Sequence, residues 1–279
     1  MDAGRIRRAA LRDSILEQAS KRVLLMGILN VTPDSFSDGG AFFDSAAAIA
    51  QAQRMETEGA DILDIGGEST RPGAAPVSAE DEAQRVLSVL PGLCADASRV
   101  VSVDTYKASV ARKAAGAGAV IINDVWGMTR DTDMAHAVAD TESAVVVTYN
   151  RGKADPDLNL VDDTRAFFDR AFTVTQAAGV PREHVILDPG VGFGKTWEQN
   201  FAVLARLDVL LDYGAPILIG VSRKSFIGKL LDRDVDDRLT GSLAAGLASV
   251  QRGASIVRVH DVGAHADALK MWKAIGEAG

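Results

Sequence analysis

Residues 99–125 read RVVSVDTYKASVARKAAGAGAVIINDV, and this stretch contains the unit from which the fold is predicted. It holds two short runs rich in Val and Ile, Arg99–Thr105 and Ala119–Val125, separated by the Ala-rich segment Tyr106–Gly116. Runs that are apolar nearly throughout are typical of parallel strands buried on both faces. The segment between them has the length and composition of a helix. The stretch therefore predicts a strand, a crossover helix and a second, parallel strand.

The same pattern continues outward in both directions. The remaining strand-like runs are Val23–Val31, Asp61–Gly67, Ala144–Asn150, Val185–Gly190, Pro216–Ser222 and Ser255–Val262. Further helical segments are Ser45–Gly59, Ala79–Leu93, Asp162–Gly179 and Glu198–Leu211. Eight strand–helix repeats without a Pro- or Ser-rich linker predict an α/β fold, a single-domain (β/α)8 TIM barrel over residues 23–279. An open, doubly wound sheet is the structural alternative.

Composition and charge narrow the class of protein. With 279 residues, 47% hydrophobic and 24% charged, the chain can bury a full-sized core. Its net charge of −8 argues against broad binding to nucleic acid or to an anionic membrane, and no apolar run reaches the length of a membrane span. The single cysteine, Cys94, cannot form an internal disulfide, so the cytoplasm is the expected compartment. Residues 1–22 lack the apolar core of a signal peptide and are expected to be an N-terminal extension, either a surface helix or a frayed segment.

Polar residues follow the apolar part of every predicted strand. In strand order they are Asn30, the loop after Gly66, Asp104, Asn123-Asp124, Thr148-Tyr149-Asn150, Asp188, Ser222-Arg223-Lys224, and Arg258 with His260. In a barrel, all carboxyl ends of the strands converge on one face, where such enzymes hold their active sites. These groups are therefore predicted to surround one pocket.

Most of these residues also have a plain structural interpretation. Asp104 can cap the next helix, and Asn123-Asp124 can make an ordinary Asx turn. The glycines of 190–194 can serve backbone geometry alone, and Lys224 can be a solvated surface cation. Arg258 differs, because a guanidinium inside an otherwise apolar strand needs an anion or several acceptors.

The charges suggest a ligand. The groups expected at the floor of the pocket offer mostly acceptors and one amide: Asp104, Asn123 and Asp188. An aminopyrimidinone edge carries matching donors and acceptors. The cations expected around the rim suit a pyrophosphate or a carboxylate: Arg71, Lys224, Arg258 and His260. An acidic floor with a basic rim favours a heterocycle that bears an anionic leaving group.

Seven segments closely resemble the dihydropteroate synthases, pterin-binding enzymes of folate biosynthesis and the targets of sulfonamides. The segments are MGILNVTPDSFSDGG at 26–40, DIGGESTRPG at 64–73, SVDT at 102–105, INDV at 122–125, LDPGVGFGKT at 187–196, SRKSFIG at 222–228 and RVHDV at 258–262. The likeness runs from about Val23 to Lys273 in the order of the family, and the first two segments are highly specific.

The resemblance implies a (β/α)8 homodimer with Mg²⁺ as cofactor. Its substrates would be small molecules, 6-hydroxymethyl-7,8-dihydropterin pyrophosphate and p-aminobenzoate, condensed to 7,8-dihydropteroate and pyrophosphate. The implied pterin ligands are Asp104, Asn123, Asp188, Lys224, Arg258, Thr148 and Phe193, of which Asp104, Lys224 and Arg258 are the expected catalytic residues. The implied p-aminobenzoate site is Phe36, Thr70, Arg71, Pro72, Phe193 and Ser225. The implied pyrophosphate ligands are Asn30, Thr70, Arg71, Arg258 and His260, with Asn30 also on the metal.

The fifth strand departs from the family pattern. The family has Met-His where this chain has Thr148-Tyr149. Since that methionine packs on the pterin ring, the smaller threonine is expected to cost about 1–3 kcal/mol of pterin affinity unless another group fills the space. Tyr149 cannot become cationic near neutral pH as an imidazole can. The main polar ligands remain, so activity is expected to survive.

The mechanism expected from these residues requires no nucleophilic triad. Mg²⁺, Arg258 and His260 would stabilise the charge on the departing pyrophosphate, and Asp104 would stabilise the electron-poor methylene carbon. The aniline nitrogen loses its proton after it has bonded, so it needs no strong base. Three alternative functions stay open: a methyltetrahydrofolate:corrinoid methyltransferase, a paralogue that binds pterin without turnover, and an unrelated phosphate-binding barrel.

Overall fold

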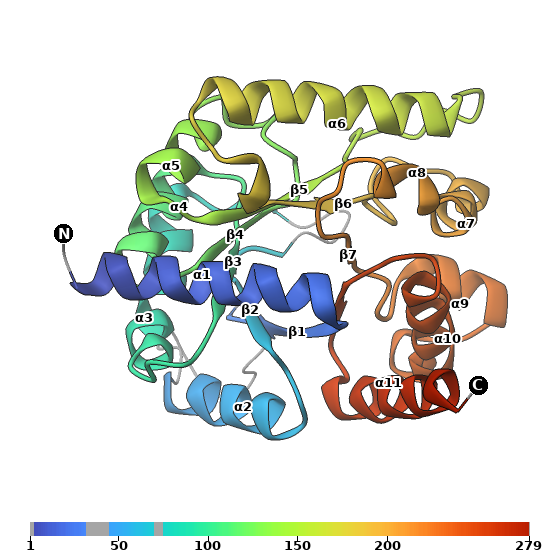
Figure 1. Cartoon of the computed structure of the whole chain (residues 1–279), viewed down its shortest axis with the longest axis horizontal. Coiled ribbons are helices and arrows are strands. Elements are labelled where there is room, and N and C mark those ends of the chain that lie inside the picture. The colour runs from blue at the N-terminus through green and yellow to red at the C-terminus, as the bar shows by residue number, and fades with distance from the viewer. Residues whose placement is uncertain (1–2, 32–44, 70–74, 279) are drawn as a thin grey trace.

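The computed structural model describes residues 3–31, 45–69 and 75–278. Eight parallel strands lie in the order β6-β5-β4-β3-β2-β1-β8-β7. They are β1 (Leu24–Asn30), β2 (Ile62–Gly66), β3 (Val101–Asp104), β4 (Ile121–Asp124), β5 (Ala144–Thr148), β6 (Val185–Asp188), β7 (Leu218–Ile219) and β8 (Ile256–Val259). A parallel bridge between Leu187 and Ile217 joins β6 to β7, the two ends of that order, and so closes the sheet into a barrel (Figure 1). The predicted (β/α)8 fold is confirmed, and the open sheet is excluded.

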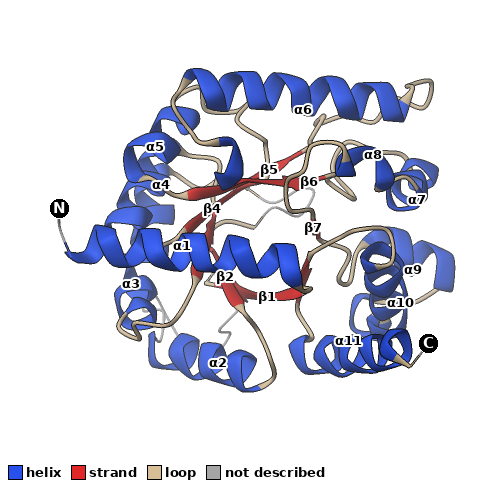
Figure 2. Cartoon of the chain, in the orientation of Figure 1, coloured by secondary structure: helices blue, strands red, loops and turns tan. Residues whose placement is uncertain are grey.

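Helices surround the strands, as the colouring by secondary structure shows (Figure 2). They are α1 (Ala3–Lys21), α2 (Ser45–Thr57), α3 (Ala79–Cys94), α4 (Ala108–Gly116), α5 (Met134–Thr141), α6 (Leu160–Ala177), α7 (Trp197–Ala205), α8 (Asp208–Leu211), α9 (Ser225–Leu231), α10 (Leu239–Val250) and α11 (Val262–Glu277), with short 3₁₀ turns at Arg182–His184 and Val235–Asp237. Among the described residues, none of these helices is long and apolar enough to cross a membrane.

One predicted helix is wrong in its extent. The segment Glu198–Leu211 forms two helices, α7 and α8, because the backbone leaves the helical region at Arg206 (φ −117°, ψ 35°). The guanidinium of Arg206 donates through Nε to Asp208 Oδ1 at 3.0 Å. Asp208 is the first residue of α8, where a carboxylate favours the start of a new helix. Apolar periodicity alone does not reveal this break.

The interior of the barrel is divided into an apolar half and a polar half. Residues two apart on a strand face the same side, so each strand contributes both kinds of residue to the interior. The apolar half, at the N-terminal ends of the strands, is one buried cluster that includes Leu24, Met26, Ile62, Ile121, Val146, Ile186, Leu218 and Ile256. Two positions further along β2, β4, β5, β6 and β8 come Asp64, Asn123, Thr148, Asp188 and Arg258. The polar residues therefore stand on an apolar floor.

Helix α1 closes the apolar end of the barrel. Ile15 and Ala19 are buried in the interior cluster just described, and α1 crosses the front of the barrel in Figure 1. Two arginines of this helix donate to backbone carbonyls at the C-terminal end of α5: Arg8 to Thr141 at 2.8 Å and Arg12 to Glu142 at 2.6 Å. The N-terminal extension was expected to be either a surface helix or a frayed segment. It forms a helix, α1, with one face buried.

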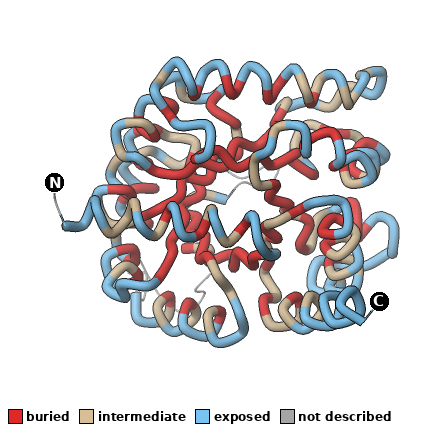
Figure 3. The backbone as a smooth tube through the Cα atoms, in the orientation of Figure 1, coloured by how far each residue is buried: buried red, intermediate tan, exposed pale blue. Residues whose placement is uncertain are grey.

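The outward faces of the strands pack against the helices. Val103 of β3, Ile122 of β4 and Val147 of β5 are fully buried in a second, larger cluster that includes residues of α2 to α6. Figure 3 shows the buried residues concentrated in the barrel and on the inner faces of the helices. Burial on both faces explains why the strands are nearly continuous apolar runs.

Candidate active site

Arg258 joins the polar ends of four strands. From β8, its Nε donates to Asp64 Oδ2 of β2 at 2.6 Å, and its Nη2 donates to Asp104 Oδ2 of β3 at 2.8 Å. Asn123 of β4 donates through Nδ2 to the same Asp64 oxygen at 3.0 Å. The carboxylates and the amide are buried, with Asp64 fully inaccessible to solvent. The structure thus brings Asp104, Asn123 and Arg258 into one network, as the sequence predicted.

A second group approaches from the β6 and β7 side. Asp188 ends β6, and its Oδ1 accepts a hydrogen bond from the Gly190 amide at 2.8 Å. Lys224 precedes α9; its Nζ donates to the Val191 carbonyl at 2.6 Å and lies 4.2 Å from the centre of the Phe193 ring. The electrostatic interactions of Lys224 with Asp188, Arg258 and Asp104 link the two groups.

Two of the plain structural interpretations are wrong, and one is confirmed. Asp104 caps no helix, since it binds Arg258 and the residue before α4 is Lys107. The turn expected at Asn123-Asp124 is confirmed, because the carboxylate of Asp124 accepts the amides of Trp126 at 2.9 Å and Met128 at 2.7 Å, while Asn123 binds Asp64. Lys224 is not a solvated surface cation, because it is held against a carbonyl and an aromatic ring.

Burial shifts the pKa values of Asp104, Asp188 and Lys224 toward neutrality. It raises the pKa of Asp104 to about 7, against the opposing charge of Arg258. It also raises the pKa of Asp188, although the Gly190 amide and Lys224 oppose the shift. Burial lowers the pKa of Lys224 to about 8. Ionisable groups near their transition at neutral pH are typical of functional sites.

The protein leaves several polar atoms in the barrel interior without a hydrogen-bond partner. Among the described residues these include Asp64 Oδ1, Ser102 Oγ and Thr148 Oγ1. Asp64 and Ser102 are Cα partners on β2 and β3, and Thr148 is the partner of Asp188 on β5 and β6. Buried polar atoms normally pair with protein, water or ligand, so this region suits a ligand with polar groups along its edge.

The remaining predicted residues on described strands also lie at this mouth. Asn30 ends β1, and its Oδ1 lies 3.4 Å from the point that a Cβ on Gly66 would occupy. His260 follows β8, and its Nδ1 lies 3.0 Å from Ser222 Oγ. Ser225 is the first residue of α9, directly after Lys224. Phe36, Thr70, Arg71 and Pro72 lie outside the described residues.

The two residues that depart from the family pattern, Thr148 and Tyr149, face opposite sides of β5. Thr148 faces the barrel interior, whereas Tyr149 belongs to the cluster between barrel and helices. Its ring centre lies 5.0 Å from that of Phe167, and its hydroxyl donates to Asp163. The prediction that Tyr149 takes the place of an imidazole therefore concerns the helix layer, and only Thr148 can alter the pocket directly.

Two residues of the site carried no predicted role. Asp64 lies inside an apolar strand, and the reasoning applied to Arg258 would also have identified it, because a buried carboxylate needs a partner. Lys195 is nine-tenths buried beside the loop after β6 and donates to three backbone carbonyls. In the sequence it is indistinguishable from a surface lysine.

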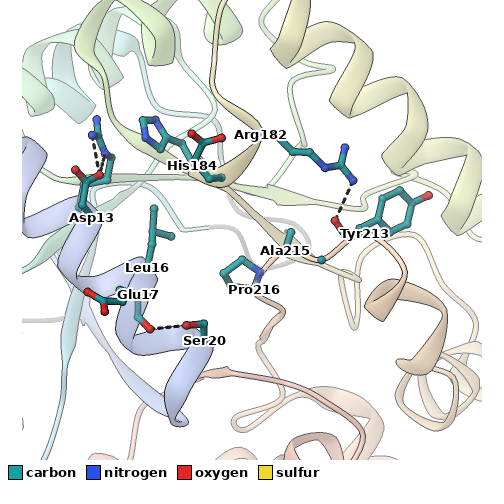
Figure 4. Close-up of a pocket in the computed structure, with 12 residues that line it drawn as sticks. Asp13, Leu16, Glu17, Ser20, Arg182, His184, Tyr213, Ala215 and Pro216 are labelled. Carbon is teal, nitrogen blue, oxygen red and sulfur yellow. Dashed lines mark hydrogen bonds and ion pairs between the residues drawn. The ribbon is translucent and has the colours of Figure 1, made fainter.

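A cavity of about 710 Å³ lies at the opposite end of the barrel. Figure 4 shows it between α1, which contributes Leu16 and Glu17, and the segments around Arg182 and Pro216. None of the polar residues at the strand ends lines it. Because enzymes of this fold act at the C-terminal face, the candidate active site is the polar mouth and not this cavity.

Comparison with known proteins identifies the family of the chain. The model of the pterin binding enzyme family matches residues 26–260. A dihydropteroate synthase from Clostridium beijerinckii is 44% identical over 252 residues, which cover 90% of this chain and 93% of the relative. A structure of dihydropteroate synthase from Clostridium difficile, solved in the presence of pteroic acid, superposes with a TM-score of 0.88 at 45% identity and covers 91% of this chain and 97% of that one.

A third comparison concerns the reaction product. A dihydropteroate synthase from Xanthomonas albilineans in complex with 7,8-dihydropteroate superposes with a TM-score of 0.83 at 41% identity, covering 91% of this chain and 94% of that one. The family model, the sequence relatives and the solved structures all point to the same family. The chain belongs to the pterin-binding enzyme family and, within it, to the dihydropteroate synthases.

Proposed function

We propose that the protein condenses 6-hydroxymethyl-7,8-dihydropterin pyrophosphate with p-aminobenzoate, giving 7,8-dihydropteroate and pyrophosphate. The observation that carries the proposal is the buried network of Arg258 with Asp64, Asp104 and Asn123 at the C-terminal mouth of the barrel. Carboxylates and an amide below a cationic rim are what a pterin with an anionic leaving group requires.

The pterin is proposed to lie across the buried carboxylates. Asp104, Asn123 and Asp188 present oxygens and one amide toward the interior, and the aminopyrimidinone edge has N–H groups and a carbonyl to pair with them. Lys224 can donate two further hydrogens in addition to the one held by the Val191 carbonyl. The polar atoms of Ser102 on β3 and Thr148 on β5 that lack a protein partner belong to the same interior.

In the proposed reaction the bond between the pterin methylene carbon and the pyrophosphate oxygen breaks, and a bond from the amine nitrogen to that carbon forms. Arg258 has three N–H groups beyond the two that bind Asp64 and Asp104, and these, together with His260, would stabilise the departing negative charge. The carboxylate of Asp104 stabilises the electron-poor carbon. The aniline nitrogen releases its proton after the new bond has formed, so no basic side chain is needed beforehand.

Mg²⁺ is proposed to bind at Asn30. Mg²⁺ prefers oxygen ligands and is commonly held by one or two protein groups together with substrate phosphates and water. The amide oxygen of Asn30 lies beside Gly66 at the end of β2. Among the described residues no cluster of three acidic, histidine or cysteine side chains is placed for a metal, so the pyrophosphate would supply most of the ligands. The ion would then neutralise charge on the leaving group.

The homodimer is also a proposal, and the structure offers a face for it. Met271 and Ile275 of α11 are 64% and 68% exposed, and Leu230, Leu231 and Leu239 of α9 and α10 are exposed as well. These three helices lie together on one side of the molecule (Figure 1). Exposed apolar residues gathered in this way are typical of protein–protein contacts.

Ile275→Glu should shift the mass in solution from dimer to monomer, and a monomeric parent protein would refute the proposal. The cytoplasmic location stays a prediction.

The second candidate function is pterin binding without turnover, which the Thr148-Tyr149 change at β5 suggests. Tyr149 lies outside the barrel interior, and Thr148 makes none of the contacts within the Arg258 network. The polar groups that the reaction needs are therefore intact, and turnover is favoured over silent binding.

The test is an assay of pyrophosphate release with both substrates, with and without Mg²⁺. We expect release that requires both substrates, needs Mg²⁺ and is inhibited competitively by a sulfonamide against p-aminobenzoate. Binding of the pterin without release would support the silent paralogue. Methyl transfer from a methylated folate to a corrinoid would support the methyltransferase alternative.

A further inference from the structure

Lys195 is a buried cation outside the network of Arg258. It follows the loop after β6, and its Nζ donates to the carbonyls of Gly190 at 2.9 Å, Tyr149 at 3.0 Å and Phe193 at 3.2 Å. An ammonium group has three hydrogens to donate, so three carbonyls match its capacity. Two of them belong to the β6 loop and one to the end of β5, and Lys195 therefore fastens the loop to the neighbouring strand.

The fastened loop carries groups of the candidate active site. Val191 accepts the hydrogen bond from Lys224 at 2.6 Å, and the ring of Phe193 lies 4.2 Å from the same ammonium group. The Gly190 amide donates to Asp188 at 2.8 Å. The loop thus has one lysine on each side: Lys224 toward the pocket and Lys195 toward β5.

The contact between loop and strand is close enough to exclude a side chain. Gly190 has φ +67°, and a Cβ on it would overlap the carbonyl oxygen of Tyr149. Two carbonyl oxygens, those of Gly190 and Tyr149, are held near each other by the same ammonium group. Without a cation between them, these oxygens would repel each other and lose their partner.

The aromatic ring of Tyr149 packs against the ammonium group of Lys195. Lys195 Nζ lies 4.0 Å from the centre of the Tyr149 ring, a cation–π geometry. The phenol donates to Asp163, which also pairs with Arg151 at 2.7 Å. The residue at which this chain departs from its family therefore contacts Lys195 through both its ring and its carbonyl oxygen.

We propose that Lys195, seated on Tyr149, is a positioning residue that sets where Lys224 and Phe193 meet the pterin substrate. Lys195 itself touches no substrate and acts through the β6 loop. The inference rests on the proposed function, because it names how that site is held in shape. Burial lowers the pKa of Lys195 to about 7, whereas the negative charge of Asp188 favours the ammonium form.

Lys195→Met tests the proposal, since methionine keeps the length of the side chain and removes every donor. The matched control is Lys153→Met, the same change at an exposed lysine in the loop after β5. We expect kcat/KM for the dihydropterin pyrophosphate to fall about 10- to 100-fold, as misplaced site groups do elsewhere, while the control stays at the parent value. Amide hydrogen exchange should rise in residues 190–194 and not elsewhere.

Several outcomes would overturn the proposal. A Lys195→Met protein with parental kcat/KM and parental exchange in the loop would do so. Uniformly raised exchange, with a lowered unfolding midpoint and an unchanged KM, would show that Lys195 only stabilises the fold. If the methionine variant does not fold, Lys195→Gln, which keeps two donor hydrogens, takes its place and should give an intermediate loss.

Exchange and pterin binding are both measured without turnover. If the parent protein releases no pyrophosphate, the proposed function fails, yet weaker calorimetric binding of dihydropterin pyrophosphate to Lys195→Met would still support the positioning role. If the parent is active and the variant equals it in binding and exchange, only the positioning role fails.

Discussion

Replacing Asp64 separates the contribution of charge at the centre of the site from that of shape. This carboxylate is fully buried and accepts hydrogen bonds from Arg258 at 2.6 Å and Asn123 at 3.0 Å. Asp64→Asn keeps the shape but removes the charge, which weakens charge-assisted bonds toward neutral ones and should cost about 1–3 kcal/mol of unfolding free energy. Asp64→Leu leaves the guanidinium and the amide without that partner and should cost about 3–5 kcal/mol.

The assay is urea denaturation at pH 7, with Asp157→Asn as the control at an exposed position. The negative charge of Asp64 also raises the pKa of Asp104, so Asp64→Asn should move the acidic limb of the kcat/KM profile to lower pH. If Asp64→Leu were as stable as the parent, or if the acidic limb stayed in place, the buried network would not hold the site as described.

Three further predictions concern Asp104 and Thr148. Asp104→Asn should keep the fold but lower kcat by orders of magnitude, measured by pyrophosphate release; a near-normal rate would remove Asp104 from the mechanism. The folded-state pKa of Asp104, about 7, lies above its ordinary value of 3.8, so the folded protein binds this proton more tightly than the unfolded chain does. The resulting contribution to the free energy of unfolding is full below about pH 4 and is lost as the pH rises through 7. Calorimetric unfolding should show this loss in the parent protein and not in Asp104→Asn. Thr148→Met should tighten pterin pyrophosphate binding by about 1–3 kcal/mol in calorimetry, because Thr148 faces the interior where the family has methionine; unchanged or weaker binding would contradict this interpretation.

Much of the fold could be predicted because each strand is buried on both faces. The run Arg99–Thr105 contains three Val residues for this reason, and the observed strand Val101–Asp104 lies within it. Polar residues at the strand ends were recognisable because little else in such a strand is polar. Arg258 was the clearest signal, since its charge requires the carboxylates that the structure places around it.

What could not be predicted depends on contacts between distant segments. The burial of α1 against the barrel follows from its fit to the apolar end of the interior, which no local pattern encodes. The role of Lys195 depends on three backbone carbonyls. Every residue type has a backbone carbonyl, so the sequence does not show which ones accept hydrogen bonds. The position of Tyr149 in the helix layer follows from strand alternation once the register is known.

The central claim is that the polar ends of the strands bind dihydropterin pyrophosphate at the C-terminal mouth of the barrel. A crystal structure with this substrate tests it most directly. We expect the aminopyrimidinone edge within hydrogen-bonding distance of Asp104, Asn123 and Asp188, with the pyrophosphate toward Arg258 and His260. A pterin bound elsewhere, for example in the cavity beneath α1, would contradict it.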